Sequence, residues 1–346
     1  MLPLFLFLQT PAFGNDLVNA DREEGFDFTV ALGAEFGEQV FSMCTGSLIT
    51  PQVILTAAHC SGDFDIELVV TMGRAFFGSR IDNADSVAFS DGVLHPDYEP
   101  LTSGWNGTLG QNDIGILVLE EPVDFVEPIW IATDPIDDIA PNQTVTSIGF
   151  GIDESGGASG LKRSAELTVD AVDETFIYSY SSTNDNSANV CSGDSGGPQV
   201  YWDGENWIQW AVHSWADQDC RAQSGSTRVD TVSEWILDQI EDVHGSRDRC
   251  EVWGLYDDGN CDLDCDEEDI DCIVEEEGDD GSSSGGGAAG DGNGNDDQAR
   301  YSPPSLKLTS GEEKGGCSVL GSRSTSLLTI GLAFLAGAVS RRRKSH

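Results

Sequence analysis

Three short segments of the chain hold residues that could together perform nucleophilic catalysis. Ser195 lies within NVCSGDSGGP (189–198), a run of residues too small to pack a core. A serine hydroxyl is a weak nucleophile, so it needs a base that accepts its proton and a third group that orients the base. His59 in TAAHC and Asp113 in NDIGILVL are candidates for these roles, since each lies at the end of an apolar run that we expect to form a strand.

The glycines beside Ser195 could complete such a site. With small neighbours, the backbone N–H groups of Gly193 and Ser195 can point at the oxyanion that develops when a carbonyl group is attacked. A single histidine or aspartate at a strand end is more often structural than catalytic. The three motifs together, in the order histidine, aspartate, serine, resemble the trypsin/chymotrypsin family of serine endopeptidases over about residues 17–243.

The resemblance implies a mechanism. Ser195 would be the nucleophile, His59 the general base and acid, and Asp113 the group that fixes the imidazole. Gly193 and Ser195 would form the oxyanion hole. The implied reaction is hydrolysis of peptide bonds in proteins or peptides through an acyl-enzyme, without a cofactor. The alternative from another class is a catalytically silent surface adhesin, a binding protein built on a protease scaffold.

The resemblance also implies an all-β fold, in which two six-stranded antiparallel β-barrels hold the site between them. The sequence agrees, because residues 17–245 alternate short apolar runs with turns rich in Gly, Asp, Asn and Pro. One helix closes this region: its apolar residues fall on one face, and Thr231 with Glu234 forms a capping box. The implied disulfides are Cys44–Cys60 and Cys191–Cys220.

Four further residues match positions that bind substrate in the family. Ser214 and Trp215 match the strand that binds the substrate backbone. Asn189 stands six residues before the nucleophile, where trypsin-like members carry an aspartate, so cleavage after Lys or Arg loses its main support. Ala216 stands where glycine is usual, so a bulky substrate side chain meets a methyl group.

His213 and Ser192 point to a different specificity. The glutamate-specific bacterial branch of the family places a histidine and a serine at these positions. An imidazole N–H and a hydroxyl can both donate to a carboxylate, which favours Glu or Asp as the residue on the acyl side of the cleaved bond (P1). The alternative is that His213 is a packed wall residue.

The amino-terminal residues predict export and activation. Residues 1–14 contain an apolar run and end in a small-x-small cleavage pattern, as a signal peptide does. The next motif, Leu17-Val18-Asn19-Ala20, resembles the family's mature start. Residues 15–16 would then be a short propeptide, and the freed Leu17 ammonium would insert beside Asp194. That cut follows an acidic residue, so an acid-specific enzyme could activate itself.

Composition limits the partners. The chain has 346 residues and a formal net charge of −44. Such charge repels phosphate, which excludes nucleic acid as a partner. Export permits oxidation of the cysteines.

An acidic cysteine-rich module is expected at residues 250–275. Its four cysteines allow three pairings, and export favours two disulfides over zinc. The cysteines are Cys250, Cys261, Cys265 and Cys272. Three alternating carboxylates could offer oxygen ligands to calcium, or could be plain solvated acid; they are Asp262, Asp264 and Asp266.

The carboxyl-terminal residues predict surface attachment. Residues 276–316 are rich in Gly, Ser, Asp and Asn and are expected to be a disordered linker. Residues 317–346 hold Cys317, a short apolar stretch and an Arg/Lys cluster. This order resembles carboxyl-terminal sorting signals of the myxobacterial or Gly-Gly type, which implies a sorting protease as partner. A simple membrane stop is the alternative reading.

Overall fold

The computed structural model of the chain describes most of the region before residue 273. All described residues belong to one compact unit, Met1–Gly278. They are residues 20–37, 39–61, 66–100, 110–136, 143–152, 159–180, 188–217, 220, 223–262, 265 and 267–272.

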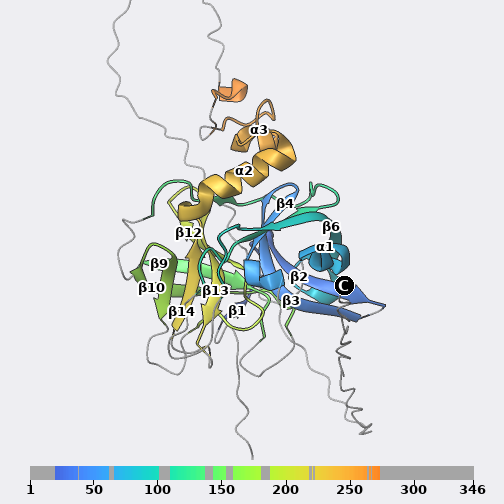
Figure 1. Cartoon of the computed structure of the whole chain (residues 1–346). Coiled ribbons are helices and arrows are strands. Elements are labelled where there is room, and N and C mark those ends of the chain that lie inside the picture. The colour runs from blue at the N-terminus through green and yellow to red at the C-terminus, as the bar shows by residue number, and fades with distance from the viewer. Residues whose placement is uncertain are drawn as a thin grey trace, which may run out of the picture. The chain divides into compact units, whose positions relative to one another are not determined.

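The first half of this unit is a closed barrel of six antiparallel strands (Figure 1). The order around the barrel is β2-β3-β4-β7-β6-β5. Alternate side chains point inward, and Leu48, Ile54 and Phe77 help to form a core within the barrel. The strands are β2 (Thr29–Phe36), β3 (Gln39–Thr50), β4 (Val53–Thr56), β5 (Gly73–Phe77), β6 (Asp85–Leu94) and β7 (Gly115–Leu119).

The second barrel also contains six antiparallel strands. Their order is β10-β11-β14-β13-β12-β9, and β9 pairs back to β10 to close the ring. The short β1 (Asp21–Arg22) adds to β10, and β8 (Trp130–Ile131) adds in parallel to β13. The prediction of two six-stranded barrels is confirmed. The ring strands are β9 (Thr144–Gly149), β10 (Arg163–Val172), β11 (Phe176–Tyr180), β12 (Pro198–Trp202), β13 (Trp207–Ala216) and β14 (Gln223–Arg228).

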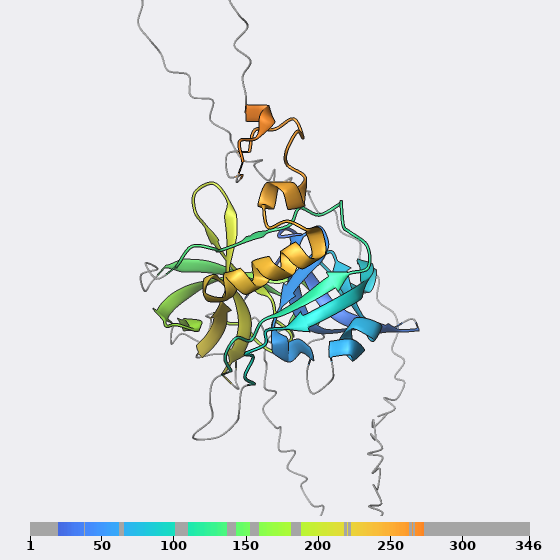
Figure 2. The same ribbon diagram turned by 45° about the horizontal axis from the view of Figure 1, so that its top comes forward.

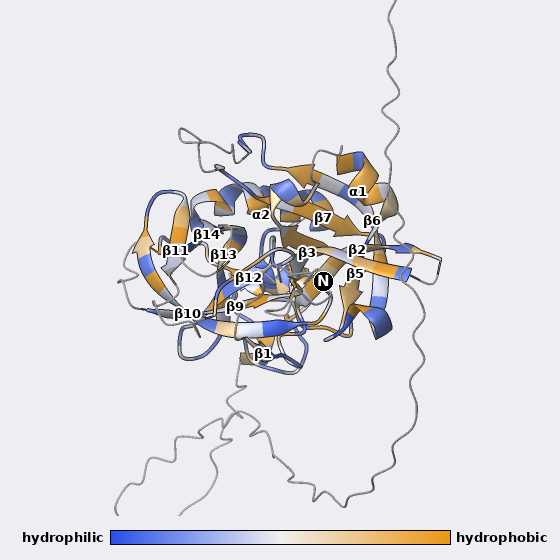
Figure 3. Ribbon diagram, turned by 90° about the horizontal axis from the view of Figure 1, so that it is seen from below, coloured by the Kyte–Doolittle hydropathy of each residue, from blue (hydrophilic) through white to orange (hydrophobic). Residues whose placement is uncertain are grey.

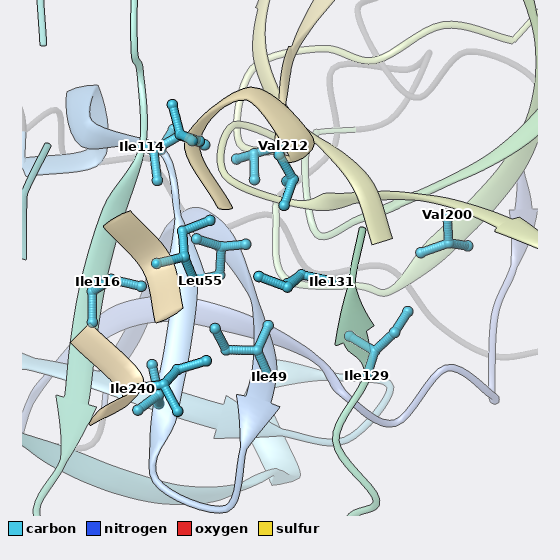
Figure 4. Packing of buried hydrophobic residues seen from close by; sticks show 14 of the residues in the cluster. Ile49, Leu55, Ile114, Ile116, Ile129, Ile131, Val200, Val212 and Ile240 are labelled. Atoms are coloured by element: carbon cyan, nitrogen blue, oxygen red, sulfur yellow. The ribbon is translucent and has the colours of Figure 1, made fainter. Parts of the chain in front are cut away.

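A shared apolar cluster joins the two barrels (Figure 4). Leu55 and Ile116 enter it from the first barrel, and Val200 and Val212 enter it from the second. The helix α2 (Ser233–His244) crosses the junction and adds the fully buried Ile240 (Figure 2). The barrels are therefore packed as one body.

The start of α2 differs from the prediction. Thr231 lies in a 3-10 turn (Asp230–Val232) that runs directly into the helix, so its hydroxyl donates to the Arg228 carbonyl and caps nothing. The helix has no side-chain cap at its start, and Glu234 instead forms an ion pair with Arg247. The prediction of a capping box is wrong because the chain enters the helix directly from this turn.

The start of the cysteine-rich segment packs at the junction of the two barrels. The short helix α3 (Arg249–Trp253) places Val252 in the shared apolar cluster, and Trp253 Nε1 donates to the Ile49 carbonyl at 3.1 Å. Two disulfides cross-link the segment, one of the three possible pairings. The pairs are Cys250–Cys265 and Cys261–Cys272.

The remaining described helices are short. They are α1 (Ile66–Met72) and the 3-10 turns Ala58–Ser61, Ile81–Asn83 and Ile270–Cys272. Figure 3 shows that apolar residues gather along the barrel strands, whereas the turns between them are mostly polar. Within the described ranges, no helix is long and apolar enough to span a bilayer.

Candidate active site

Ser195 lies on a tight turn just before β12, and this turn needs its glycines. Gly193 and Gly196 have positive φ angles of +95° and +83°, which L side chains rarely adopt. A Cβ on Gly196 would also collide with the Thr56 hydroxyl and with the Thr45 carbonyl. The bare run around Ser195 is thus explained by backbone geometry.

Thr45 of β3 holds this turn from the opposite barrel. Its N–H donates to the Ser195 carbonyl at 2.8 Å, and its hydroxyl donates to the Gly193 carbonyl at 2.8 Å. The same hydroxyl accepts the Phe150 N–H at 3.0 Å. Thr45 is fully buried. Thr45 was not predicted from the sequence, because a threonine in a β-like run carries no signal of such contacts.

The His59 ring is fixed by the Asp113 carboxylate. His59 follows β4 in a 3-10 turn, and Asp113 precedes β7, the strand that pairs with β4. His59 Nδ1 lies 2.7 Å from Asp113 Oδ2, and the His59 backbone N–H donates to Oδ1 at 2.9 Å. Ser214 Oγ also donates to Oδ2, at 2.6 Å. Two contacts from one residue fix the imidazole with Nδ1 toward the acid, which leaves Nε2 to act as a base.

The His59 turn lies beside the Ser195 turn. The Cys44–Cys60 disulfide ties His59's neighbour to β3. Cys60 Sγ lies 3.5 Å from the Ser195 carbonyl oxygen. The side chain of His59 is 35% exposed, so it remains open to substrate, whereas that of Asp113 is 4% exposed. The three residues singled out from sequence therefore gather at the barrel junction.

Asp194 is completely buried beneath the turn. Its carboxylate accepts the Gly151 N–H at 2.8 Å and the Cys191 N–H at 2.9 Å. A Cβ on Gly149 or Gly151 would collide with it. Burial raises the pKa of Asp194 to about 7, although the two N–H donors favour the charged form.

A cavity of about 310 Å³ opens beside Ser195. Five of the predicted substrate-binding residues line it: Ser192, His213, Ser214, Trp215 and Ala216. Asn189 is not among the lining residues; it is fully buried, and its Oδ1 accepts the Val190 N–H at 3.0 Å. The cavity wall includes Cys191 and Cys220, which form the expected disulfide.

His213 is a neutral ring at the cavity wall. It is 1% exposed, and burial lowers its pKa to about 3. Nδ1 lies 3.0 Å from Ser226 Oγ, while Nε2 has no hydrogen-bond partner among the described residues. If the Ser226 hydroxyl donates to Nδ1, the ring proton lies on Nε2.

Asp217 is a lining residue that the sequence analysis missed. It directly follows Ala216 at the end of β13, and its Oδ1 accepts the Gln223 N–H at 2.8 Å. Its position after the substrate-binding strand was the available signal. A carboxylate here opposes acidic substrate side chains, so the cavity wall has an acid as well as the neutral His213 ring.

Several predicted features lie outside the described residues: the signal peptide (1–14), propeptide (15–16), Leu17, linker (276–316) and tail (317–346). Of the three carboxylates predicted to bind calcium, only Asp262 is among the described residues, since Asp264 and Asp266 are not. The described residues bring together one candidate metal-ligand group, Cys44 with His59 and Cys60, but those two thiols are joined as a disulfide.

Comparison with known proteins identifies the family. The family described as Trypsin matches residues 19–236. A trypsin from Saccharopolyspora erythraea is 32% identical over 186 residues, which cover 50% of this chain and 75% of that protein. Brachyurin from Leptuca pugilator is 29% identical over 213 residues (57% and 87%), and chymotrypsin from Phaedon cochleariae is 28% identical over 235 residues (62% and 78%). The chain belongs to the trypsin family, and it is a serine endopeptidase.

The neutral state of His213 gives the folded protein a measurable pH dependence. The unfolded histidine binds a proton near pH 6.5, whereas the folded one binds it near pH 3, so stability falls as the pH drops below 6.5. The loss from this residue should reach about 2 kcal/mol at pH 5. Urea unfolding of wild type and His213→Val at pH 7 and pH 5 measures it. If both proteins lose equal stability over this range, His213 is not a buried neutral ring.

Proposed function

We propose that Ser195, His59 and Asp113 form the catalytic triad of this endopeptidase. The observation that carries the proposal is the double contact of Asp113 with His59, in a chain whose Ser195 borders the adjoining cavity. A histidine held in this way has one ring nitrogen committed to the acid and the other available to a hydroxyl.

The proposed reaction has two stages, acylation of Ser195 and hydrolysis of the acyl-enzyme, and His59 transfers one proton in each. Ser195 Oγ attacks the carbonyl carbon while His59 Nε2 accepts its proton, and the N–H groups of Gly193 and Ser195 stabilise the oxyanion. His59 then gives that proton to the leaving amine. A water molecule next transfers a proton to His59 and attacks the acyl-enzyme, and Ser195 leaves with the proton returned. Asp113 stays ionised throughout.

The triad can be tested by substitution. Asp113→Asn should lower kcat by on the order of 10⁴-fold, because an amide favours the wrong ring tautomer. Ser195→Ala should abolish labelling by a fluorophosphonate. Asp97→Asn, an exposed carboxylate on the preceding loop, is the matched control and should leave kcat unchanged. If Asp113→Asn keeps a tenth or more of the wild-type kcat, the triad assignment is wrong.

We also propose a preference for Glu, and less for Asp, at P1. If the ring proton lies on Nε2, a neutral His213 at the cavity wall could donate to a substrate carboxylate without bringing a second charge, and Ser192 offers a hydroxyl from the lining. The unpartnered, buried Nε2 supports this reading, because a buried donor normally has an acceptor. Asp217 weakens the preference by repelling the same carboxylate.

Kinetics on matched peptides with Glu, Ala, Phe or Arg at P1 test this specificity. His213→Val should lower kcat/KM for the Glu peptide by up to about 10⁴-fold, because a site built around a polar partner loses that partner. The same substitution should leave kcat/KM for the Ala peptide unchanged. Asp217→Asn should raise kcat/KM for the Glu peptide. A wild-type enzyme that prefers Phe or Arg would show that His213 is only a wall residue.

The mature enzyme is further proposed to begin at Leu17, after removal of residues 1–16. The pairing of β1 with β10 supports this, because Arg163 of β10 also pairs with Gly149, which adjoins Asp194. Residue 17 lies four positions before Asp21, a reach of about 13 Å when extended. A freed ammonium at Leu17 could therefore reach the Asp194 carboxylate.

We propose that the enzyme is exported and then held at the cell surface by residues 317–346. Four disulfides in the described region favour an oxidising compartment. Deletion of residues 317–346 should release active enzyme into the medium, because both barrels are complete without them. Activity measured in cells and medium checks this. Retention of the truncated protein on cells would refute the anchoring role.

A further inference from the structure

A large groove lies apart from the cavity beside Ser195. Its volume is about 860 Å³, and none of its lining residues lines the Ser195 cavity. Four parts of the chain form its walls: residues 25–28 before β2, residues on both sides of β8, the turn between β12 and β13, and α3. The proposed triad and the proposed P1 preference use none of these residues.

The groove is lined by aromatic rings that remain open to solvent. Four of the lining residues are tryptophans: Trp130, Trp202, Trp207 and Trp253. Trp202 and Trp207 are paired across β12 and β13, with ring centres 5.4 Å apart, and both are exposed. The Phe26 ring lies 5.2 Å from that of Trp207. Exposed aromatic rings gathered around a groove indicate a binding surface, because a core would bury them.

Carboxylates accompany these rings. Among the described residues that line the groove, five are acidic and only Arg249 is basic. The acids are Asp27, Glu127, Asp134, Asp203 and Glu205. Glu127, Asp134 and Glu205 are exposed, and no basic side chain in the described part of the chain forms an ion pair with them. The groove therefore offers negative charge that the folded protein itself does not neutralise.

The wall at Phe26 is fixed by buried contacts. Phe26 has a φ angle of +49°, which a residue with a Cβ rarely adopts. Its carbonyl accepts the Thr29 N–H at 2.8 Å and the Lys162 amine at 3.2 Å, and this amine also lies 3.5 Å from Asp27. The Lys162 side chain is completely buried, although burial of an amine is costly. The Phe26 ring is thus held beside Trp207 without a ligand.

The groove already contains one example of the contact that its composition favours. The Arg249 guanidinium lies 4.5 Å from the centre of the Trp253 ring, as a cation–π pair. A guanidinium group can stack on a ring in this way while a carboxylate accepts its N–H groups. The whole chain is acidic, so charge alone does not define a site. Exposed rings and unpaired carboxylates in one groove do, and together they favour a ligand with several guanidinium groups.

We propose that this groove binds an arginine-rich segment of a partner protein. Its guanidinium groups stack on exposed rings such as that of Trp207, and carboxylates such as that of Glu205 accept their N–H groups. The groove is then a second contact surface, separate from the cavity beside Ser195, and its residues take no part in catalysis. The inference goes beyond the proposed function and does not depend on the triad.

Fluorescence anisotropy with a labelled peptide of alternating arginine and glycine tests the proposal. The protein is the full chain with Ser195→Ala, so that the proposed nucleophile cannot cleave the probe. A peptide with citrulline in place of arginine keeps the shape and loses the charge, and it should bind at least about 10-fold more weakly. The Kd of the arginine peptide should rise about 10-fold between low salt and about 0.5 M NaCl, because salt screens exposed charges.

Substitutions locate the binding. In the Ser195→Ala chain, Trp207→Ala should raise the Kd about 10-fold and Glu205→Gln about 3-fold. Two matched controls lie outside the groove and should leave the Kd unchanged: Phe36→Ala removes an exposed ring near the β2–β3 turn, and Glu166→Gln removes an exposed carboxylate from β10. With Ser195 present, Trp207→Ala and Glu205→Gln should keep the wild-type kcat/KM on a short peptide, which verifies their folding.

Four results would overturn the inference. Equal Kd values for groove and control variants would mean that the peptide binds the acidic surface at large, and equal binding of the citrulline peptide would mean that charge has no role. Tighter binding of a neutral chitin oligosaccharide than of the arginine peptide would make the groove a glycan site. A dimer in sedimentation that Trp207→Ala dissociates would make a second copy of the chain its occupant. None of these measurements requires catalysis, so each decides the role of the groove even if the proposed triad is wrong.

Discussion

Thr45 of β3 makes the contact on which the site depends, because the proposed catalytic groups are divided between two barrels. His59 and Asp113 come from the first barrel, and the Ser195 turn comes from the second. Thr45 reaches across with its backbone and its hydroxyl and fixes the turn at two carbonyl groups. The shared apolar cluster keeps the barrels together, but apolar packing is not directional. The threonine hydrogen bonds supply the orientation.

Burial shifts the pKa values of the two ionisable groups behind the turn in opposite directions. Asp194 and His213 are both inaccessible to solvent, and burial disfavours the charged form of each. The acid is therefore easily protonated and the base is hard to protonate. The two groups also differ in their partners: Asp194 is bound by two backbone N–H groups, whereas His213 Nε2 has no hydrogen-bond partner among the described residues. The proposed roles follow from this difference: Asp194 shapes the turn, and a neutral His213 donates to the substrate.

The sequence predicts the parts of this protein whose signals are local. The motifs around His59, Asp113 and Ser195 point to the fold and to the family, because their residue types and order are rare in combination. Contacts that join distant segments leave no such mark. Thr45 is one ordinary threonine in a strand, and its role depends on which residues the second barrel brings to it. Asn189 matches a pocket position by its spacing from Ser195, yet its side chain is turned to its own backbone. The capping box likewise fails because a preceding turn, specified elsewhere, governs the start of α2.

The docking of α3 has a mechanical consequence. A pull on the chain beyond Cys272 passes first to Cys261 through one disulfide, and Cys265 in the same segment is joined to Cys250 through the other. Cys250 lies in α3, whose Val252 and Trp253 are fixed to the shared core and to the Ile49 backbone. The force therefore reaches the barrels through α3, which is packed in the core, and the disulfides prevent the segment between them from extending under tension. If the enzyme is held through its carboxyl-terminal residues as proposed, shear forces would act on this cross-linked segment before they reach the Ser195 turn.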